Sequence, residues 1–182
     1  MTKHLVAGAF MVVALGLTTF AQAPQPPKPS AEQKELAYFV GRWTSEGEMK
    51  PGPFGPGGKA TGSDTCEWFE GGFSVVCRGQ AKSPMGTMSS LGVMSYSAAD
   101  KAYTYYAIDS MGMSELARGN KKGNTWVYTA TSNFGGQSFQ SRYTIVVTGP
   151  GSYTFTWESS PDGTKWSTMF EGKATRAGGT SR

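Results

Sequence analysis

The chemistry open to this protein is limited first by its histidine content. The chain has one histidine, His4, which lies in an apolar N-terminal stretch. Without that stretch no imidazole remains to act as a general base or to complete a Ser-His-Asp or Cys-His system. Carboxylates remain, and a hydrolase that uses a pair of them is one alternative. We expect each of the candidates to be a solvated strand or turn residue: Asp64, Glu67, Asp109, Glu115 and Glu158.

Two cysteines, Cys66 and Cys77, flank a turn sequence that reads Glu70-Gly71-Gly72-Phe73. If Gly71-Gly72 is a two-residue hairpin turn, the cysteines face each other as a hydrogen-bonded pair, with Cα atoms ~5.5 Å apart. That separation suits a disulfide. Two cysteines without a histidine cannot build a zinc site, so we predict no metal and no cofactor.

Methionines recur at short spacing, as Met85 and Met88 and again as Met111 and Met113. Thioethers of an exported protein can bind Cu(I). The alternative, which we prefer, is that these flexible side chains fill apolar gaps.

Residues 1–23 read as a signal peptide. Lys3 precedes an uncharged apolar run from Leu5 to Phe20, and Ala21-Gln22-Ala23 is typical of a cleavage site. The run is shorter than the ~20 residues that span a bilayer, although an uncleaved anchor is the alternative. Cleavage after Ala21 is a second possibility. The sequence therefore predicts export to the periplasm or medium of a bacterium, where a disulfide is the expected state of the two cysteines.

Composition favours one all-β domain. The 182 residues include 25 Gly and 10 Pro, with 13% aromatic and 16% charged side chains. The formal net charge of +4 falls to +3 without Lys3, which is too small for a nucleic-acid surface. Residues 24–30 are a proline-rich tether, residues 31–176 form the domain, and residues 177–182 are expected to be a disordered tail.

The elements that must position these residues are one short helix and about ten strands. Ser30 and Gln33 form a capping box for a helix over 31–40. Turn signals separate ten candidate strands, and short connections predict an antiparallel up-and-down meander that closes into a barrel. The strands are expected at 42–49, 60–69, 73–81, 87–96, 102–109, 113–118, 125–132, 138–148, 152–158 and 165–175.

Alternation along these strands sorts aromatic side chains onto one face, which we assign to the interior. Trp166 is placed inward with them because it shares the parity of Phe170. An aromatic interior with few polar groups suits an apolar ligand, but the same rings could instead fill the barrel as its core. The predicted ligand-binding residues are Trp126, Tyr128, Phe139, Tyr143, Phe155, Trp157 and Phe170.

Gly41-Arg42-Trp43, at the first strand and after a short helix, resembles the G-x-W signature of the calycins. The ten strands resemble the fatty-acid-binding-protein and nitrobindin branch, and most closely a family of secreted bacterial proteins, domain-of-unknown-function family 1579, over about Leu36 to Arg176. The resemblance implies a basic side chain of the last strand packed on Trp43. Arg176 has the inward parity for this contact, and Lys173 does not.

Two features separate the chain from its relatives with known ligands. Fatty-acid-binding relatives hold a carboxylate with inward arginine, whereas Arg78 and Arg142 fall on the outward face and Arg118 is unassigned. Nitrobindin-like relatives bind haem iron through histidine, which the mature chain lacks. We therefore expect an exported protein that binds a small apolar or amphipathic ligand without catalysis. A structural or interaction domain of the cell envelope is the main alternative.

Overall fold

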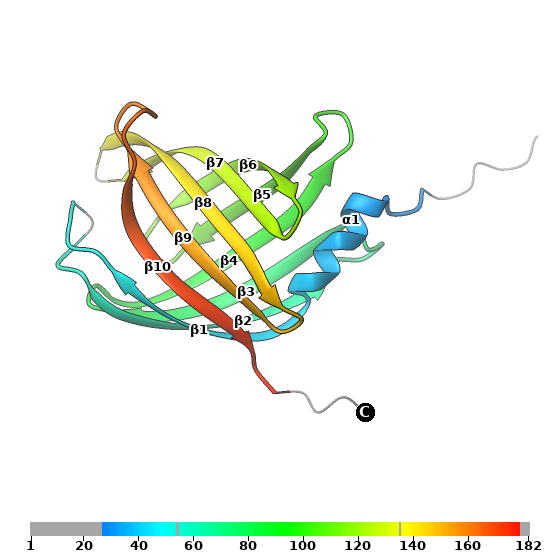
Figure 1. Cartoon of the computed structure of the whole chain (residues 1–182), viewed down its shortest axis with the longest axis horizontal. Coiled ribbons are helices and arrows are strands. Elements are labelled where there is room, and N and C mark those ends of the chain that lie inside the picture. Colours follow the sequence, from blue (N-terminus) through cyan, green and yellow to red (C-terminus); the bar gives the residue numbers. More distant parts are fainter. Residues whose placement is uncertain (1–26, 54, 135, 179–182) are drawn as a thin grey trace, which may run out of the picture.

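The computed structural model describes residues 27–53, 55–134 and 136–178 (Figure 1). The predicted signal peptide and the last four residues of the predicted tail lie outside the described residues. No helix in the described ranges is long and apolar enough to cross a membrane.

Ten antiparallel strands close into a barrel in which each strand pairs with its sequence neighbours and β1 pairs with β10 (Figure 1). This confirms the predicted up-and-down barrel, and closure removes the free edges that an open sheet would expose. The strands are β1 (Gly41–Met49), β2 (Gly58–Trp68), β3 (Ser74–Ser83), β4 (Gly86–Ser97), β5 (Ala102–Asp109), β6 (Ser114–Lys122), β7 (Thr125–Phe134), β8 (Gln137–Gly149), β9 (Ser152–Ser160) and β10 (Ser167–Arg176).

The helical segment consists of α1 (Ala31–Glu35) and a 3-10 turn, η1 (Leu36–Phe39). The predicted capping box is present: the Gln33 amide donates to the Ser30 hydroxyl (3.3 Å), and the Ser30 amide donates to the Gln33 side chain (2.8 Å). The helix lies across one end of the barrel (Figure 1). Glu35 holds it there, because it accepts a hydrogen bond from the Tyr103 hydroxyl (2.8 Å) and pairs with Lys121 (3.1 Å).

Aromatic rings close this end of the barrel from inside. Phe39, which is buried, packs edge-on against Trp126 with ring centroids 5.1 Å apart. Trp43 lies 5.0 Å from Tyr153, and its indole nitrogen donates to the Phe39 carbonyl (2.7 Å). The helix therefore serves as a plug whose apolar side continues the barrel core.

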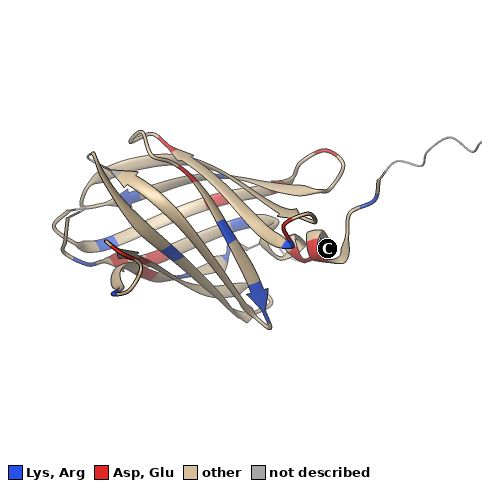
Figure 2. Ribbon diagram, turned by 90° about the horizontal axis from the view of Figure 1, so that it is seen from above, with Lys and Arg blue, Asp and Glu red and all other residues tan. Residues whose placement is uncertain are grey.

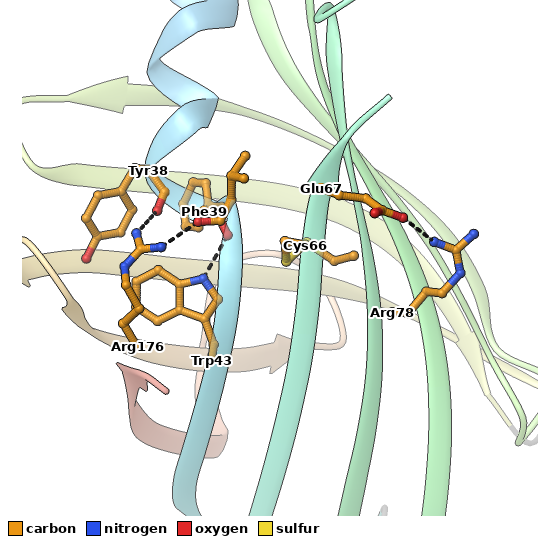
Figure 3. The surroundings of a disulfide bond; sticks show 9 residues. Tyr38, Phe39, Trp43, Cys66, Glu67, Arg78 and Arg176 are labelled. Carbon is orange, nitrogen blue, oxygen red and sulfur yellow. Dashed lines mark hydrogen bonds and ion pairs between the residues drawn. A yellow bond between two sulfur atoms is a disulfide. The ribbon is translucent and has the colours of Figure 1, made fainter. Parts of the chain in front are cut away.

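The first and last strands meet at a cation–π contact. Trp43 pairs with Arg176 across β1 and β10, and the guanidinium lies 4.5 Å from the indole centroid (Figure 3). Arg176 also donates to the carbonyls of Val40 and, at 2.8 Å, Tyr38. Gly41 has a φ of +130°, and a Cβ there would collide with the guanidinium. Gly41 thus makes room for the cation that stacks on Trp43.

The predicted pairing of Cys66 with Cys77 is confirmed by a disulfide (Figure 3). The predicted type of pair is wrong. The Phe69 amide bonds the Ser74 carbonyl (2.9 Å), so the loop has four residues, 70–73, instead of two. Hydrogen-bonded pairs alternate along a ladder, which makes Cys66 and Cys77 a non-hydrogen-bonded pair. Their Cα atoms are accordingly only 4.0 Å apart.

An irregularity in β10 changes the face of Trp166. The register between β10 and β9 shifts between Thr168 and Phe170, so parity is not conserved across that point. Phe170 faces the interior, but Trp166 lies outside, where the Arg142 guanidinium stacks over its ring at 4.2 Å. The prediction of an inward Trp166 is wrong for this reason.

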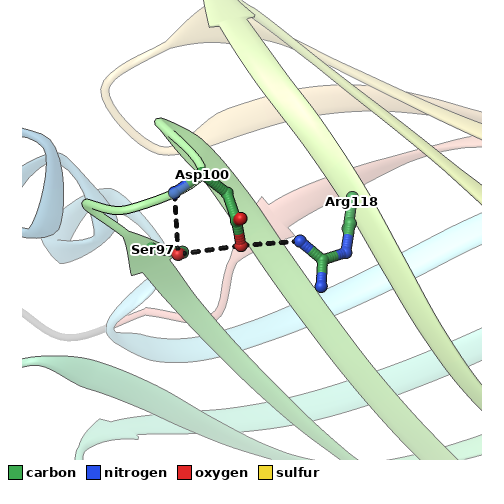
Figure 4. Close-up of polar contacts among 3 residues, drawn as sticks. All are labelled: Ser97, Asp100 and Arg118. Carbon is green, nitrogen blue, oxygen red and sulfur yellow. Dashed lines mark hydrogen bonds and ion pairs between the residues drawn. The ribbon is translucent and has the colours of Figure 1, made fainter.

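Charged side chains of both signs are spread along the outer faces of the strands (Figure 2). Arg142 forms a bidentate pair with Glu158, at 2.7 and 2.9 Å. Arg118 pairs with Asp100 (2.6 Å), whose carboxylate also accepts from Ser97 (Figure 4). Arg78 pairs with Glu67 (3.2 Å). The three arginines considered as possible carboxylate ligands are thus held on the outside.

Candidate functional site

The barrel encloses a cavity of about 440 Å³. Volumes of this order hold small organic ligands. The cavity reaches from the plug residues Phe39 and Trp43 towards the opposite end of the barrel. Six of the predicted ligand-binding residues line it: Tyr128, Phe139, Tyr143, Phe155, Trp157 and Phe170.

Trp126 is the exception among the seven predicted residues. It is buried against the rings of Tyr38 and Phe39, with Lys121 over its face at 4.8 Å. It does not belong to the cavity lining. The prediction of its inward face was correct, but its position near the start of β7 places it in the plug.

Methionines line the cavity at the end away from the helix. Met49 ends β1, Met85 and Met88 flank the start of β4, and Met111 and Met113 lie in the β5–β6 loop. Thioether side chains are flexible and polarisable, so they can adapt to apolar groups of different shape. The two methionine pairs noticed in the sequence therefore form one end of the same cavity.

Inward glycines create the space into which aromatic rings extend. A Cβ at Gly92 would lie 2.6 Å from the Tyr105 hydroxyl, and a Cβ at Gly172 would lie 2.7 Å from the Phe155 ring. Ring and glycine face each other across paired strands, β4 with β5 and β9 with β10. The glycines let the rings lie along the wall instead of across the lumen, which helps to leave the centre open.

One wall carries a buried polar network around Glu115. This carboxylate is only 5% exposed and accepts hydrogen bonds from Ser132 and Tyr143. Ser141 lies 2.7 Å from Ser132 and accepts from the Trp157 indole at 3.3 Å. The expectation that Glu115 is solvated is wrong, because the strand turns this side chain inward and satisfies it there.

Asp64 is the second carboxylate in the cavity wall. Within the described part of the chain it accepts no hydrogen bond, and burial raises the pKa of its carboxyl above the ordinary value of 3.8. The expectation of a solvated residue is wrong here too. Parity could have placed it inward, because Asp64 is two residues from Cys66, whose partner Cys77 was assigned to the interior.

Two tyrosine hydroxyls complete the polar part of the wall. Tyr128 is 1% exposed, and its hydroxyl finds no hydrogen-bond partner among the described residues. Burial and the nearby carboxylates Asp64 and Glu115 raise the pKa of Tyr105 to about 12. Burial likewise raises the pKa of Tyr128. Both hydroxyls are therefore neutral at physiological pH and can either donate or accept a hydrogen bond.

The described residues contain no group of three or more His, Cys, Asp or Glu side chains placed to hold a metal ion. The cavity thus offers chemistry of a binding kind: apolar and aromatic surface, carboxylates and neutral hydroxyls.

Comparisons with solved structures show a shared fold. The crystal structure of Rv2717c from M. tuberculosis matches with a TM-score of 0.63 and 10% identity, over 83% of this chain and 100% of that one. A de novo designed fluorescence-activating β-barrel matches with a TM-score of 0.45 and 17% identity, over 78% of this chain and 96% of that one. No curated protein matches the sequence.

A family model matches residues 28–176, which covers the helix and all ten strands. The matched range includes the Gly41–Trp43 signature, the cysteine pair and Arg176. The chain therefore belongs to the family described as protein of unknown function (DUF1579).

Proposed function

We propose that the protein is an exported binding protein that holds a small apolar or amphipathic ligand in the barrel cavity. The observation that carries this proposal is the cavity of about 440 Å³ with its aromatic and methionine walls. A barrel core that served stability alone would gain from filling that space, because lost packing costs free energy. An open, mostly apolar interior with a few polar groups is typical of ligand sites.

The test is binding of an apolar fluorescent probe, followed by quenching of tryptophan emission. Saturable binding with one site per chain is expected. Trp157→Leu should change the affinity several-fold because its ring lines the cavity. Trp166→Leu is the matched control, since Trp166 stacks on Arg142 outside the barrel.

Two results would contradict the proposal. Absence of saturable binding to the folded protein would favour a structural domain of the envelope. Equal effects of Trp157→Leu and Trp166→Leu would indicate that the probe binds outside the cavity.

Export is the second part of the proposal. It is supported by the apolar leader with its Ala21-Gln22-Ala23 site and by the disulfide, which is compatible with an oxidising compartment. Intact mass of the protein from its own host should correspond to a chain that begins at residue 24, or at residue 22 for cleavage after Ala21. A mature chain that retains residues 1–21 and stays in the cytosol would overturn this part.

A further inference from the structure

The charge of the cavity wall has one sign. Three carboxylates line it, from Asp64, Asp109 and Glu115, and no described lining residue is a Lys, Arg or His. The arginines nearest in sequence to the lining strands are held in ion pairs on the outer face. A ligand carboxylate would therefore meet like charge without a compensating cation.

The three carboxylates differ in how they are satisfied. Glu115 is held by Ser132 and Tyr143. Asp109 ends β5 and accepts from the amides of Met111 (2.8 Å) and Met113 (3.0 Å). Only Asp64 accepts no hydrogen bond from the described protein, so its full acceptor capacity is directed at the cavity.

Space for the Asp64 carboxylate is built into the neighbouring strand. Asp64 pairs with Gly79 on β3, and a Cβ at Gly79 would collide with a carboxylate oxygen and lie 2.7 Å from the Ser90 hydroxyl. The carboxylate therefore lies over a glycine, with a hydroxyl beside it. Any larger residue at Gly79 would displace it.

A second, independent group points to the same ligand position. Tyr128 lines the cavity, is 1% exposed, and has a hydroxyl with no partner in the described chain. Buried hydroxyls normally find a partner because the unsatisfied state costs free energy. A ligand with a polar head beside Tyr128 would supply that partner.

Aromatic rings surround the carboxylate. Tyr105 and Tyr153 both lie within electrostatic range of Asp64, and the Tyr105 and Tyr128 rings are 6.3 Å apart. An organic cation is attracted by the faces of aromatic rings as well as by a carboxylate. The combination suits a positively charged nitrogen attached to an apolar body.

We propose that the ligand is a cationic amphiphile whose charged nitrogen pairs with Asp64 among Tyr105, Tyr128 and Tyr153, while its apolar part extends towards the methionine end. This inference rests on the proposed binding function and names the ligand class. It also separates this protein from fatty-acid-binding relatives, whose ligands carry the opposite charge.

The experiment compares three probes with the same chain: decylamine, decan-1-ol and decanoate, each below its aggregation concentration. Isothermal titration at pH 7 should give the amine at least ~10-fold higher affinity than the alcohol, and the alcohol higher affinity than decanoate. Asp64→Asn should lower amine affinity by ~10-fold or more and leave alcohol affinity within ~2-fold.

Glu67→Gln is the matched control, because it removes one carboxylate from the outer face of the same strand. It should leave the preference for the amine unchanged. Retained binding of the alcohol by Asp64→Asn shows that this variant has kept its cavity, so loss of amine binding is then specific.

The outcomes separate the two proposals. Binding of the alcohol without preference for the amine would overturn the ligand class and leave the binding function standing. Tighter binding of decanoate would overturn it as well. Failure of all three probes, together with failure of the neutral fluorescent probe, would overturn the binding function itself.

Discussion

Asp64 is a residue that an apolar barrel interior does not need for stability. Its carboxylate is desolvated, and no hydrogen bond from the described chain offsets that cost. Its pKa in the folded state therefore lies above the ordinary value of 3.8. A residue that costs stability at neutral pH and faces a cavity is a strong candidate for a binding role.

The pH dependence of stability tests this assignment. Because the folded-state pKa is raised, the folded protein binds the proton more tightly than the unfolded chain does. Stability from this group is thus fully present below pH 3.8 and is lost as pH rises through the raised value. Asp64→Asn should therefore be more stable than wild type at pH 7 without ligand, and the advantage should vanish towards pH 3.

Urea unfolding of both proteins across this range measures the effect. Glu67→Gln serves as the control, because its ion pair with Arg78 is exposed and its loss should change the free energy of unfolding by less than ~1 kcal/mol at either pH. A wild type more stable than Asp64→Asn at pH 7 would contradict the desolvated carboxylate.

Among the elements, β1 and β10 close the barrel, and Trp43 with Arg176 joins them at the plugged end. Trp43 is 2% exposed, so Trp43→Ala should destabilise the fold by ~3–5 kcal/mol. Arg176→Ala should cost ~0.5–2 kcal/mol. Because the side chains are in contact, the double variant should lose less than the sum.

A double-mutant cycle by chemical denaturation measures this coupling. Lys173 provides the comparison, since it lies on the opposite face of the same strand and pairs with Glu46 (2.9 Å). Trp43→Ala and Lys173→Ala should be additive within ~0.5 kcal/mol. Additivity in the Arg176 cycle would show that the stacked contact contributes nothing to closure.

The β2–β3 hairpin is the element constrained by the disulfide. Cys66 and Cys77 are separated by 11 residues, so the bond closes a short loop and should add ~2–3 kcal/mol. Replacing both cysteines by alanine should lower the free energy of unfolding by that amount while the barrel still folds. Thiol titration of the denatured, unreduced protein should find no free thiol, and two free thiols would refute the bond.

The whole molecule is a barrel with one plugged end and one end lined by methionines. This asymmetry predicts a pattern of methionine oxidation by peroxide under native conditions. Met111 is 45% exposed at the open end, whereas Met94 and Met169 are 6% and 5% exposed. Peptide mass mapping should therefore find sulfoxide at Met111 well before Met94 or Met169.

Occupancy of the cavity should extend the pattern. Met85 and Met88 line the cavity and should be protected by a saturating ligand, while the exposed Met111 should change less. Uniform oxidation of all these methionines in folded protein would indicate that the barrel is not closed as described.

Much of the architecture could be predicted because local rules determine it. Glycine and proline turns divided the chain into the ten strands, and short connections gave their antiparallel order. Counting outward from the hairpin paired Cys66 with Cys77. Counting along β10 after its irregularity singled out Arg176 over Lys173, and Arg176 is the residue that lies over Trp43.

Tertiary structure alone decided which face of β6 is buried. Leu116 is 53% exposed on this strand, while the adjacent Glu115 is 5% exposed. A prediction based on hydrophobicity would reverse them. The barrel tolerates the inversion because Ser132 and Tyr143, from two other strands, satisfy the carboxylate.

Depth along the barrel was equally invisible in the sequence. Trp126 and Tyr128 share a strand and a face, yet one belongs to the plug and the other to the cavity. Period-two alternation gives the face of a residue and says nothing of its height, which depends on the tilt and stagger of all ten strands together. The sequence by itself determined strand order and facing; closure of the barrel and docking of the helix determined where the interior is filled and where it is open.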